Sequence, residues 1–383
     1  MQTLDFPNAL FSKKQWLLSE LQSAGLRIGD APSTAPSRSG GAGPTDHKAV
    51  TVLGTTIMVP IHTRDAASSP FSAGNVSENG TAALFRDGEQ IASIQFPPEP
   101  KFYGLATADG VPYWKISQLH SQRVLATTLL QTCIRYENSE TRCQFCAIGE
   151  SLKAGRTIRE KSPAQLAEVA AAAQRLDGID NVVMTTGTPP TPDRGAAVLA
   201  AAAFAIKQAT NLPIQAQCEP PDDFHWFVKL RANGVDTLGM HLEAWDESVR
   251  HRIMPGKAEV PMSYYMEAFA AAVNVFGRGQ VSTYLLAGLG DTVDGLLEGC
   301  CQLISLGVYP FVVPFVPVTG TPLAGHAPPP TPDFMKAVLA PLGTMLTEAG
   351  MTSDTVKAGC AKCGACSSLS SFEKTNQSPC SHA

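Results

Sequence analysis

The feature that most constrains the fold is a regular alternation of strand-like and helix-like segments between residues 124 and 316. Short apolar and β-branched runs predict strands at 124–131, 181–186, 213–218, 236–242, 281–287 and 310–316. Helical spacing of apolar residues predicts helices at 163–176, 195–209, 222–233, 262–276 and 292–306. Parallel neighbours in a sheet need a crossover, which a helix supplies. The alternation therefore predicts a parallel α/β sheet.

The size of this region suits a partial (β/α)6 barrel of the TIM type, or a complete barrel if the flanks contribute strands. A doubly wound open sheet has the same alternation and remains the alternative. We expect three regions: an N-terminal α+β extension at 1–115, the barrel at 116–325, and a C-terminal helix with a cysteine-rich tail at 326–383.

The flanks of the barrel have simpler patterns. The extension begins with a predicted helix, Ala9–Ala24, followed by a Gly/Pro/Ser-rich loop at 31–44. Strand-like runs follow at Val50–Pro60 and Ala82–Phe96. After the barrel, a proline-rich joint leads to a predicted helix, Asp333–Ala349.

Composition excludes several classes of protein. Of the 383 residues, 44% are apolar and 16% charged, which is typical of a globular chain rather than a disordered one. The net charge of −5, with scattered Lys and Arg, argues against nucleic-acid or membrane-surface binding. No signal-peptide pattern is present, and the longest apolar stretch, Ala196–Ile206, is shorter than the ~20 residues of a membrane span. We expect a cytoplasmic protein, in which grouped cysteines are more often metal ligands than disulfides.

Three cysteines lie just past the first predicted strand, in the segment CIRYENSETRCQFC: Cys133, Cys143 and Cys146. The C-terminal ends of barrel strands are where sites are built. A structural zinc ion usually takes four ligands, and a disulfide would leave one thiol over. A [4Fe–4S] cluster held by three thiolates leaves one iron open to a small molecule. The triplet favours such a cluster, and zinc remains the alternative.

Two later strand ends carry further motifs, LLAGLGDT at Leu285–Thr292 and PFVPVTGTPLAG at Pro314–Gly325. Together with the triplet, and with Phe145 before its last cysteine, they resemble the radical S-adenosylmethionine (SAM) enzymes of the biotin synthase-like branch. The resemblance covers about residues 120–325. It implies a radical SAM type of barrel and two cofactors, a [4Fe–4S] cluster and SAM. It also implies an electron donor such as flavodoxin or ferredoxin.

The first cysteine gap departs from that branch, because it holds nine residues (134–142) where three are usual. The extra residues can loop outward without disturbing the three sulfurs. The CX9CX2C spacing resembles an uncharacterised radical SAM family encoded beside a nitrilase in cyanide-utilisation gene clusters. That resemblance suggests a small polar substrate, such as a nitrogen-containing metabolite.

The resemblance also implies SAM-binding positions. At the second strand end, Thr186 and Gly187 stand where relatives carry a GGE-like motif, although threonines there are often plain turn residues. Gly288 and Gly290 belong to the GLGDT turn.

The fourth strand end supplies another candidate. Glu243 matches the position that contacts the SAM ribose, and its alternative is a salt bridge to Arg250 or Arg252. Either Lys257 or Arg252 would lie near the SAM carboxylate.

Polar residues alternate along the third and fourth strands. Gln215, Gln217 and Glu219 share one face, and His241 and Glu243 share the corresponding face of the next strand. In a barrel these faces point inward, with Glu219 and Glu243 nearest SAM. Gln217 and His241 lie one layer deeper, where we expect them to hold substrate as catalytic residues. The alternative is a buried hydrogen-bond network without a ligand.

The tail contains a second cysteine group, Cys360, Cys363 and Cys366, with Cys380 fourteen residues further on. CxxCxxC spacing is typical of ferredoxin-type clusters, so we expect an auxiliary [4Fe–4S] cluster with Cys380 or a substrate atom as fourth ligand. A zinc knuckle is the alternative. The remaining cysteines, Cys218, Cys300 and Cys301, are predicted core residues.

These patterns predict a radical SAM oxidoreductase or lyase acting on a small metabolite. Two other classes remain: a non-catalytic iron–sulfur electron carrier or sensor, and a zinc-stabilised binding protein. The GLGDT and GTPLA strand ends favour the enzyme, because a carrier needs no nucleoside pocket.

Overall fold

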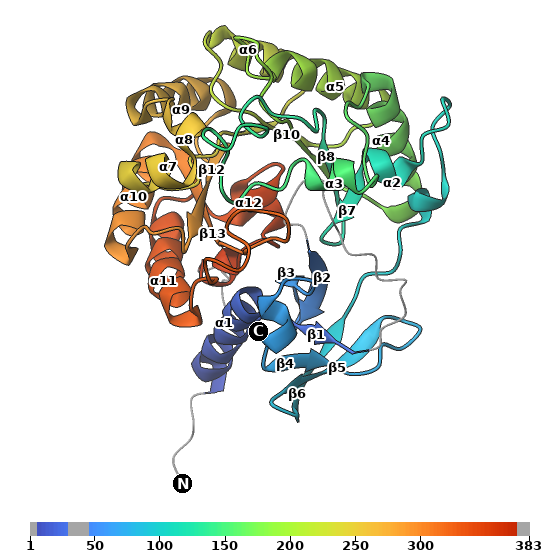
Figure 1. The fold of residues 1–383 in the computed structure, drawn as a ribbon, viewed down its shortest axis with the longest axis vertical. Coiled ribbons are helices and arrows are strands. Elements are labelled where there is room, and N and C mark those ends of the chain that lie inside the picture. Colours follow the sequence, from blue (N-terminus) through green and yellow to red (C-terminus); the bar gives the residue numbers. More distant parts are fainter. Residues whose placement is uncertain (1–5, 30–45, 374–383) are drawn as a thin grey trace, which may run out of the picture.

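The computed structural model describes residues 6–29 and 46–373. It contains two sheets, a seven-stranded one with the order β13-β12-β11-β10-β9-β8-β7 and a six-stranded one with the order β1-β4-β5-β6-β2-β3. Figure 1 shows the larger sheet curling inside an arc of helices, with the smaller sheet and α1 beside the open side of that arc.

The seven-stranded sheet forms the predicted barrel. Its strands are β7 (Gln118–His120), β8 (Val124–Thr128), β9 (Asn181–Thr185), β10 (Ile214–Gln217), β11 (Thr237–Gly239), β12 (Val281–Ala287) and β13 (Val308–Pro314). Strands β8 to β13 are parallel and follow chain order, whereas β7 is antiparallel to β8.

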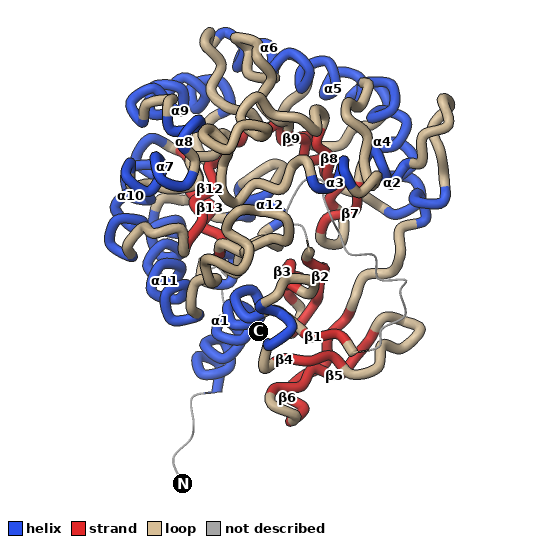
Figure 2. The backbone as a smooth tube through the Cα atoms, in the orientation of Figure 1, coloured by secondary structure: helices blue, strands red, loops and turns tan. Residues whose placement is uncertain are grey.

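Helices cover the outside of this sheet (Figure 2). They are α4 (Pro163–Asp177), α5 (Ala196–Ala209), α6 (His225–Ala232), α9 (Met262–Phe276), α10 (Val293–Leu306) and α11 (Pro332–Glu348). A doubly wound sheet would reverse its strand order at a switch point and carry helices on both faces. The sequential order and the outer helices instead confirm the predicted partial barrel.

Local sequence explains why these elements form. All seven residues of β13 are buried, as expected for a parallel strand covered on both faces. Helix α4 begins with a capping box, in which the Ser162 hydroxyl accepts the Gln165 amide and the Gln165 side chain accepts the Ser162 amide. Thr292 of the GLGDT turn caps α10 by accepting the Gly295 N–H at 3.0 Å.

The N-terminal unit packs α1 (Phe6–Ala24) against a mainly antiparallel sheet. Its strands are β1 (Arg27–Ile28), β2 (His47–Val52), β3 (Thr55–Pro60), β4 (Phe71–Ala73), β5 (Thr81–Arg86) and β6 (Glu89–Gln95). The interpretation of Val50–Pro60 and Ala82–Phe96 as continuous runs was wrong, because each contains a hairpin turn. Leu53, Gly54, Asp87 and Gly88 adopt φ values of 48°, 75°, 49° and 88°, as two-residue hairpin turns require.

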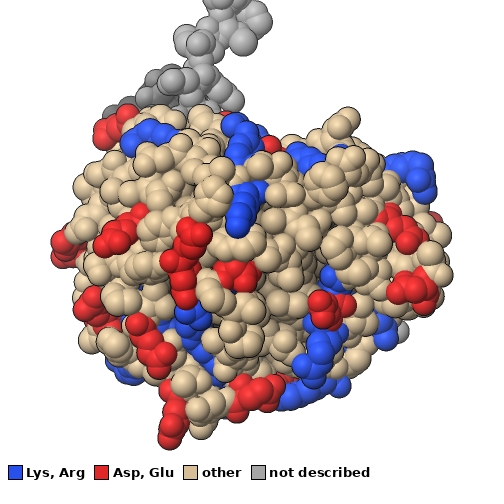
Figure 3. Space-filling view, turned by 90° about the horizontal axis from the view of Figure 1, so that it is seen from above, with Lys and Arg blue, Asp and Glu red and all other residues tan. Residues whose placement is uncertain are grey.

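Short elements complete the described chain. The helices are α2 (Tyr113–Ile116), α3 (Glu150–Lys153), α7 (Glu247–Ile253), α8 (Pro255–Ala258) and α12 (Cys360–Cys363), and the 3₁₀ turns are Asp65–Ser68, Lys101–Gly104, Ser353–Thr355 and Leu369–Ser371. None of the helices in the described ranges is both long and apolar enough to cross a membrane. Acidic and basic side chains are interspersed on the face shown in Figure 3.

The cysteine tail docks at the N-terminal ends of the barrel strands. Asn181, Gln215, Thr237 and Gln280 lie at or beside the starts of β9 to β12. Their side chains hydrogen-bond backbone groups between Thr355 and Cys360 at distances of 3.0 to 3.4 Å. The tail therefore closes the end of the half-barrel that is opposite the C-terminal strand ends.

Candidate functional site

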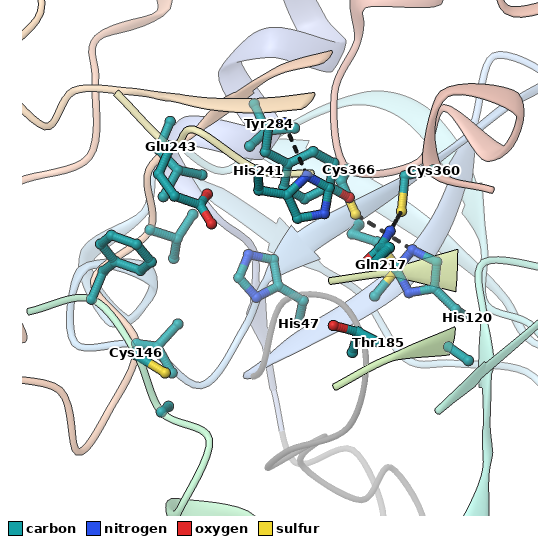
Figure 4. A pocket seen from close by; sticks show the side chains of 18 of the residues that line it. His47, His120, Cys146, Thr185, Gln217, His241, Glu243, Tyr284, Cys360 and Cys366 are labelled. Atoms are coloured by element: carbon teal, nitrogen blue, oxygen red, sulfur yellow. Dashed lines mark hydrogen bonds between the residues drawn. The ribbon is translucent and has the colours of Figure 1, made fainter. Parts of the chain in front are cut away.

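A cavity of about 350 Å³ lies inside the half-barrel. Its lining includes one cysteine of the first group, Cys146, and all three described cysteines of the tail. Polar side chains lie between these groups, and Figure 4 shows them directed into the cavity: His47, His120, Thr185, Gln217, His241, Glu243 and Tyr284. The chain thus brings two cysteine groups, far apart in sequence, to one cavity.

The first cysteine group follows β8, at the C-terminal end of the barrel. Its loop is held against the end of β9 by a backbone hydrogen bond from Ile134 N–H to the Thr188 carbonyl, 3.0 Å. Gly187 permits this approach, because a Cβ there would lie 2.0 Å from the Thr132 carbonyl oxygen. Gly187 is therefore placed to position the cysteine loop.

The nine residues between Cys133 and Cys143 dock onto the α7–α8 segment. Arg135 Nε donates to the Gly256 carbonyl at 2.6 Å, and the Gly256 N–H donates to Thr141. The Arg135 guanidinium also pairs with Glu219, whose other neighbour is the Thr188 hydroxyl at 2.9 Å. Burying this carboxylate requires a cation, and the long loop supplies it. Glu219 does not line the cavity in which the sequence placed it.

The thiols of the first group lie within electrostatic reach of one another. Burial raises the pKa of Cys143 to about 12, Lys257 opposes the rise, and Cys146 adds to it. Burial likewise raises the pKa of Cys146 to about 11, with Cys133 adding to the rise and Arg142 opposing it. These two thiols are therefore protonated at neutral pH when no metal is bound, so cluster binding would release protons.

His241 points one unpaired nitrogen into the cavity. Its Nδ1 accepts the Tyr284 backbone N–H at 3.2 Å, which places the proton of the neutral ring on Nε2. That Nε2 is buried and has no hydrogen-bond partner among the described residues. Burial lowers the pKa of His241 to about 4, so the ring is neutral at physiological pH. His241 is poised to donate a hydrogen bond to a ligand.

Glu243 lies at the cavity wall in a left-handed conformation, with φ 68°. Its partner is Lys257, whose Nζ lies 2.9 Å from Oε1 in a largely buried pair. The expected alternative, a bridge to Arg250 or Arg252, was wrong: Arg250 Nη2 donates to the Val260 carbonyl, and Arg252 Nη2 to the Leu289 carbonyl. Burial opposes protonation of Lys257, but Glu243 raises its pKa above the ordinary value.

The third strand carries a buried network. Gln217 Nε2 donates to Gln215 Oε1 at 2.8 Å and contacts Cys360 Sγ at 3.2 Å. Gln215 Nε2 in turn donates to Ser282 Oγ at 3.3 Å, and Gln215 Oε1 accepts the Cys360 N–H. The predicted inward face and its alternative, a hydrogen-bond network, thus coexist. Gln215 lies deepest and holds the tail.

The tail cysteines face the cavity from the opposite end. Cys363 interacts with Ser121, and Cys366 Sγ lies 3.4 Å from His120 Nε2. Within residues 6–29 and 46–373, no three His, Cys, Asp or Glu side chains converge on a single ion position. Cys380 lies outside the described residues.

Other predicted SAM-binding residues have packing roles. Gly288 and Gly290 adopt φ values of 105° and 133°. A Cβ on Gly290 would lie 2.3 Å from Arg252 Nη2, so the glycine leaves room for that side chain. Asp291 accepts the backbone N–H groups of Trp245 and Asp246, tying the GLGDT turn to the fourth strand end.

The predicted site residues therefore fall into two sets. Those that line the cavity are Cys146, Thr186, Gln217, His241, Glu243, Cys360, Cys363 and Cys366. Those that lie outside its lining are Cys133, Cys143, Gly187, Glu219, Arg252, Lys257, Gly288 and Gly290. Of the cysteines expected in the core, Cys218 and Cys300 are buried, but Cys301 is exposed because it faces outward on α10.

Sequence reasoning missed several polar residues of the cavity, among them His47, His120 and Tyr284. Tyr284 could have been found, because Ser282, Tyr284 and Leu286 alternate along β12 in the same way as the polar residues of β10. His47 and His120 belong to β2 and β7, outside the predicted barrel strands. No local signal marked them.

Comparison with known proteins finds a family match over part of the chain. The radical SAM superfamily profile matches residues 136–298. Bacteriochlorophyllide c C-7(1)-hydroxylase of Chlorobaculum limnaeum is 36% identical over 127 residues, which are 33% of this chain and 31% of that protein. The chain thus spans about a third of the length of the curated relative it matches.

Solved structures were also compared. Methylornithine synthase (PylB) aligns with a TM-score of 0.44 and 18% identity, over 57% of this chain and 61% of that one. A radical SAM methyltransferase from Sphaerobacter thermophilus aligns with a TM-score of 0.46 and 15% identity, over 76% of each chain.

Proposed function

We propose that this chain, a member of the radical SAM superfamily, cleaves SAM reductively and uses the 5′-deoxyadenosyl radical to abstract hydrogen from a small polar metabolite. Enzymes of this superfamily use a [4Fe–4S] cluster and SAM. We assign the cluster to Cys133, Cys143 and Cys146, and its electron to a flavodoxin or ferredoxin. The observation that carries the proposal is the cavity that Cys146 shares with Gln217 and His241.

The residues present fit these cofactors. Three thiols near one strand end suit a cubane with one open iron, and Glu243 at the wall can accept hydrogen bonds from a ribose diol. The buried Nε2–H of His241, unpaired among the described residues, is a costly arrangement unless a ligand accepts its hydrogen bond. We expect substrate to lie against His241 and Gln217, one layer below Glu243.

The size of the cavity and a few polar groups in its wall support this choice of substrate class. About 350 Å³ is near the lower end for small-molecule sites, which favours a compact metabolite. Amide and imidazole groups at the cavity wall suit polar or nitrogen-containing functional groups. Water exclusion by the buried strands around them would protect a radical from side reactions.

The tail supports a second, auxiliary cluster held by Cys360, Cys363 and Cys366. These cysteines line the cavity at the N-terminal strand ends, whereas Cys146 lies at the C-terminal ends. A substrate between the two groups would have SAM on one side and the auxiliary cluster on the other.

The test is reductive SAM cleavage under anaerobic conditions. Cys143→Ala removes one thiolate, so we expect 5′-deoxyadenosine formation to fall to background, on the order of a thousandfold or more below the wild type. Cys301→Ala, at an exposed position, serves as the matched control and should leave cleavage unchanged. Undiminished 5′-deoxyadenosine from Cys143→Ala would contradict the assignment. Deuterium transfer from candidate metabolites into 5′-deoxyadenosine, followed by mass spectrometry, would identify the substrate.

A further inference from the structure

Tyr284 lies between His241 and the tail cysteines. It belongs to β12, and its ring stacks on the His241 imidazole, with the ring centroids 4.4 Å apart and the planes 20° from parallel. The hydroxyl at the far end of the side chain hydrogen-bonds the Cys360 thiol and lies within electrostatic reach of Cys363 and Cys366. One side chain therefore extends from the proposed substrate position to the tail cysteines (Figure 4).

The alternation of side chains along β12 accounts for this position. Ser282, Tyr284 and Leu286 lie on one face of the strand, because successive side chains point to opposite faces. Ser282 is near the start of the strand, where its hydroxyl accepts the Gln215 amide at 3.3 Å. Leu286 is near the end and lines the cavity together with Tyr284. Tyr284 thus occupies the middle level, between the tail and the end of the barrel that carries the first cysteine group.

The Cys360 sulfur has two hydrogen-bond partners in the cavity wall. Gln217 Nε2 lies 3.2 Å from Sγ, and the Tyr284 hydroxyl makes the second contact. A cysteine that ligates iron is a thiolate, so it can only accept hydrogen bonds. Both side chains would then donate to a negatively charged sulfur, and such bonds are about twice as strong as those between neutral groups. The backbone of Cys360 is fixed as well, because Gln215 Oε1 accepts its N–H at 3.0 Å.

We propose that Tyr284 is a positioning residue for the tail cluster: its hydroxyl donates to the Cys360 thiolate and, with the Gln217 amide, raises the reduction potential of the cluster. The proposal rests on the proposed auxiliary cluster and holds whichever group supplies the fourth ligand. Hydrogen bonds to the sulfurs are among the features that set the potential of such clusters. Reduction adds a negative charge, so a donor beside the sulfur stabilises the reduced state more than the oxidised one. Side chains of the substrate cavity would thereby control how readily the tail cluster accepts an electron.

The experiment measures the tail cluster alone in the full-length chain. The triple variant Cys133→Ala, Cys143→Ala, Cys146→Ala, reconstituted anaerobically, should hold about four irons. Its midpoint potential is determined by EPR during titration with dithionite and redox mediators. Adding Tyr284→Phe removes the hydroxyl but keeps the ring. At the midpoint of the triple variant, the ratio of reduced to oxidised cluster should then fall about tenfold, a shift of about 59 mV to more negative potential for a one-electron couple.

Two further variants in the same background distinguish this hydrogen bond from a general effect of substitution. Gln217→Leu removes the other donor to Cys360 and should shift the potential in the same direction. Tyr264→Phe is the matched control, because the Tyr264 hydroxyl lies on the outer helix α9 and donates to the Pro221 carbonyl at 2.8 Å. This control should leave the potential unchanged.

The possible results bear on different parts of the proposal. An unchanged potential in Tyr284→Phe, with four irons bound, overturns the role of the hydroxyl. Loss of iron in that variant also overturns it, since Tyr284 would then be required for cluster assembly. A triple variant that binds zinc or no metal overturns the auxiliary cluster itself. Reductive SAM cleavage, which depends on the first cysteine group, tests the proposed function separately.

Discussion

One hydrogen bond determines which nitrogen of His241 can donate to a ligand. Because Nδ1 already accepts the Tyr284 N–H, the ring can only donate from Nε2. Its low pKa, about 4, keeps the ring from acting as a cation between pH 5 and 8. A neutral donor suits a substrate carbonyl or imine nitrogen better than a carboxylate.

A substitution at His241 should lower product formation without lowering formation of the radical. His241→Ala should retain the iron content and SAM binding but lower product formed per 5′-deoxyadenosine about a hundredfold, because a radical reacts with whatever hydrogen is nearest. His225→Ala, at an exposed position on α6, is the matched control. The pH profile of wild-type turnover should show no inflection from this ring between pH 5 and 8. An unchanged ratio of product to 5′-deoxyadenosine in His241→Ala would show that His241 does not hold the substrate.

Lys161 is a second residue whose charge is set by burial. Its Nζ contacts Gln131 Oε1 and the Ile158 carbonyl, both at 3.2 Å, and no carboxylate lies within ion-pair distance among the described residues. Burial lowers its pKa from 10.5 to about 7. The unfolded chain therefore binds more protons than the folded one between those values. The free energy of unfolding should rise as pH increases from about 7 to 10.5.

This dependence can be measured by denaturant unfolding. Lys161→Met should stabilise the protein at pH 7 by on the order of 2 kcal/mol and flatten the rise between pH 7 and 10. Lys13→Met, at an exposed position of α1, should change neither quantity by more than a few tenths of a kcal/mol. Equal pH slopes for wild type and Lys161→Met would contradict a neutral buried amine.

At the scale of elements, the parts that could be predicted are those in which apolar residues recur at a regular spacing. Strands β9, β10 and β12 and helices α4, α5 and α9 begin and end within one residue of their predicted ranges, because buried parallel strands and amphipathic helices have distinct spacing. The hairpins in the N-terminal unit were missed because strand-like residues continue on both sides of each two-residue turn, although Asp87-Gly88 is a typical hairpin pair. The docking of the tail depends on contacts such as Cys366 with His120, which are 246 residues apart. The sequence around either residue gives no sign of a contact between segments so far apart.

The tail itself yields a prediction at this scale. Wild-type protein reconstituted anaerobically should hold roughly eight irons. The variant Cys360→Ala, Cys363→Ala, Cys366→Ala should hold about half that number and still cleave SAM slowly, because the first cysteine group is intact. Cys301→Ala should retain the full content. About four irons with one zinc in the wild type would make the tail a structural metal site.

At the scale of the whole molecule, the N-terminal unit is hydrogen-bonded to the tail. Gln22 of α1 donates to the Ala365 carbonyl at 3.0 Å, and the Met58 N–H of β3 donates to the same carbonyl at 2.7 Å. Ser19 and Ser368 share a buried hydrogen bond of 2.9 Å. The unit also places His47 in the cavity. The unit, tail and barrel therefore form one continuous network.

We expect metal at the tail to stabilise the N-terminal unit. In the tail-cysteine triple variant, amide hydrogen exchange at Met58 should accelerate at least tenfold relative to amides paired between β2 and β3. Gln22→Ala should destabilise the iron-loaded protein by about 0.5–1.5 kcal/mol, since the Ala365 carbonyl loses one of its two donors. Gln90→Ala, on the exposed part of β6, is the control. Unchanged Met58 exchange in the triple variant would show that the tail holds its place without metal.

In the described residues the tail covers the N-terminal ends of the barrel strands, so the end at the first cysteine group is the one that it leaves uncovered. Under the proposed function, SAM bound to a cluster at that group would cover this second end. Substrate that uses this route would then bind before SAM, and its product would leave after methionine and 5′-deoxyadenosine. Such an order of binding would keep a reactive radical from forming in the absence of substrate.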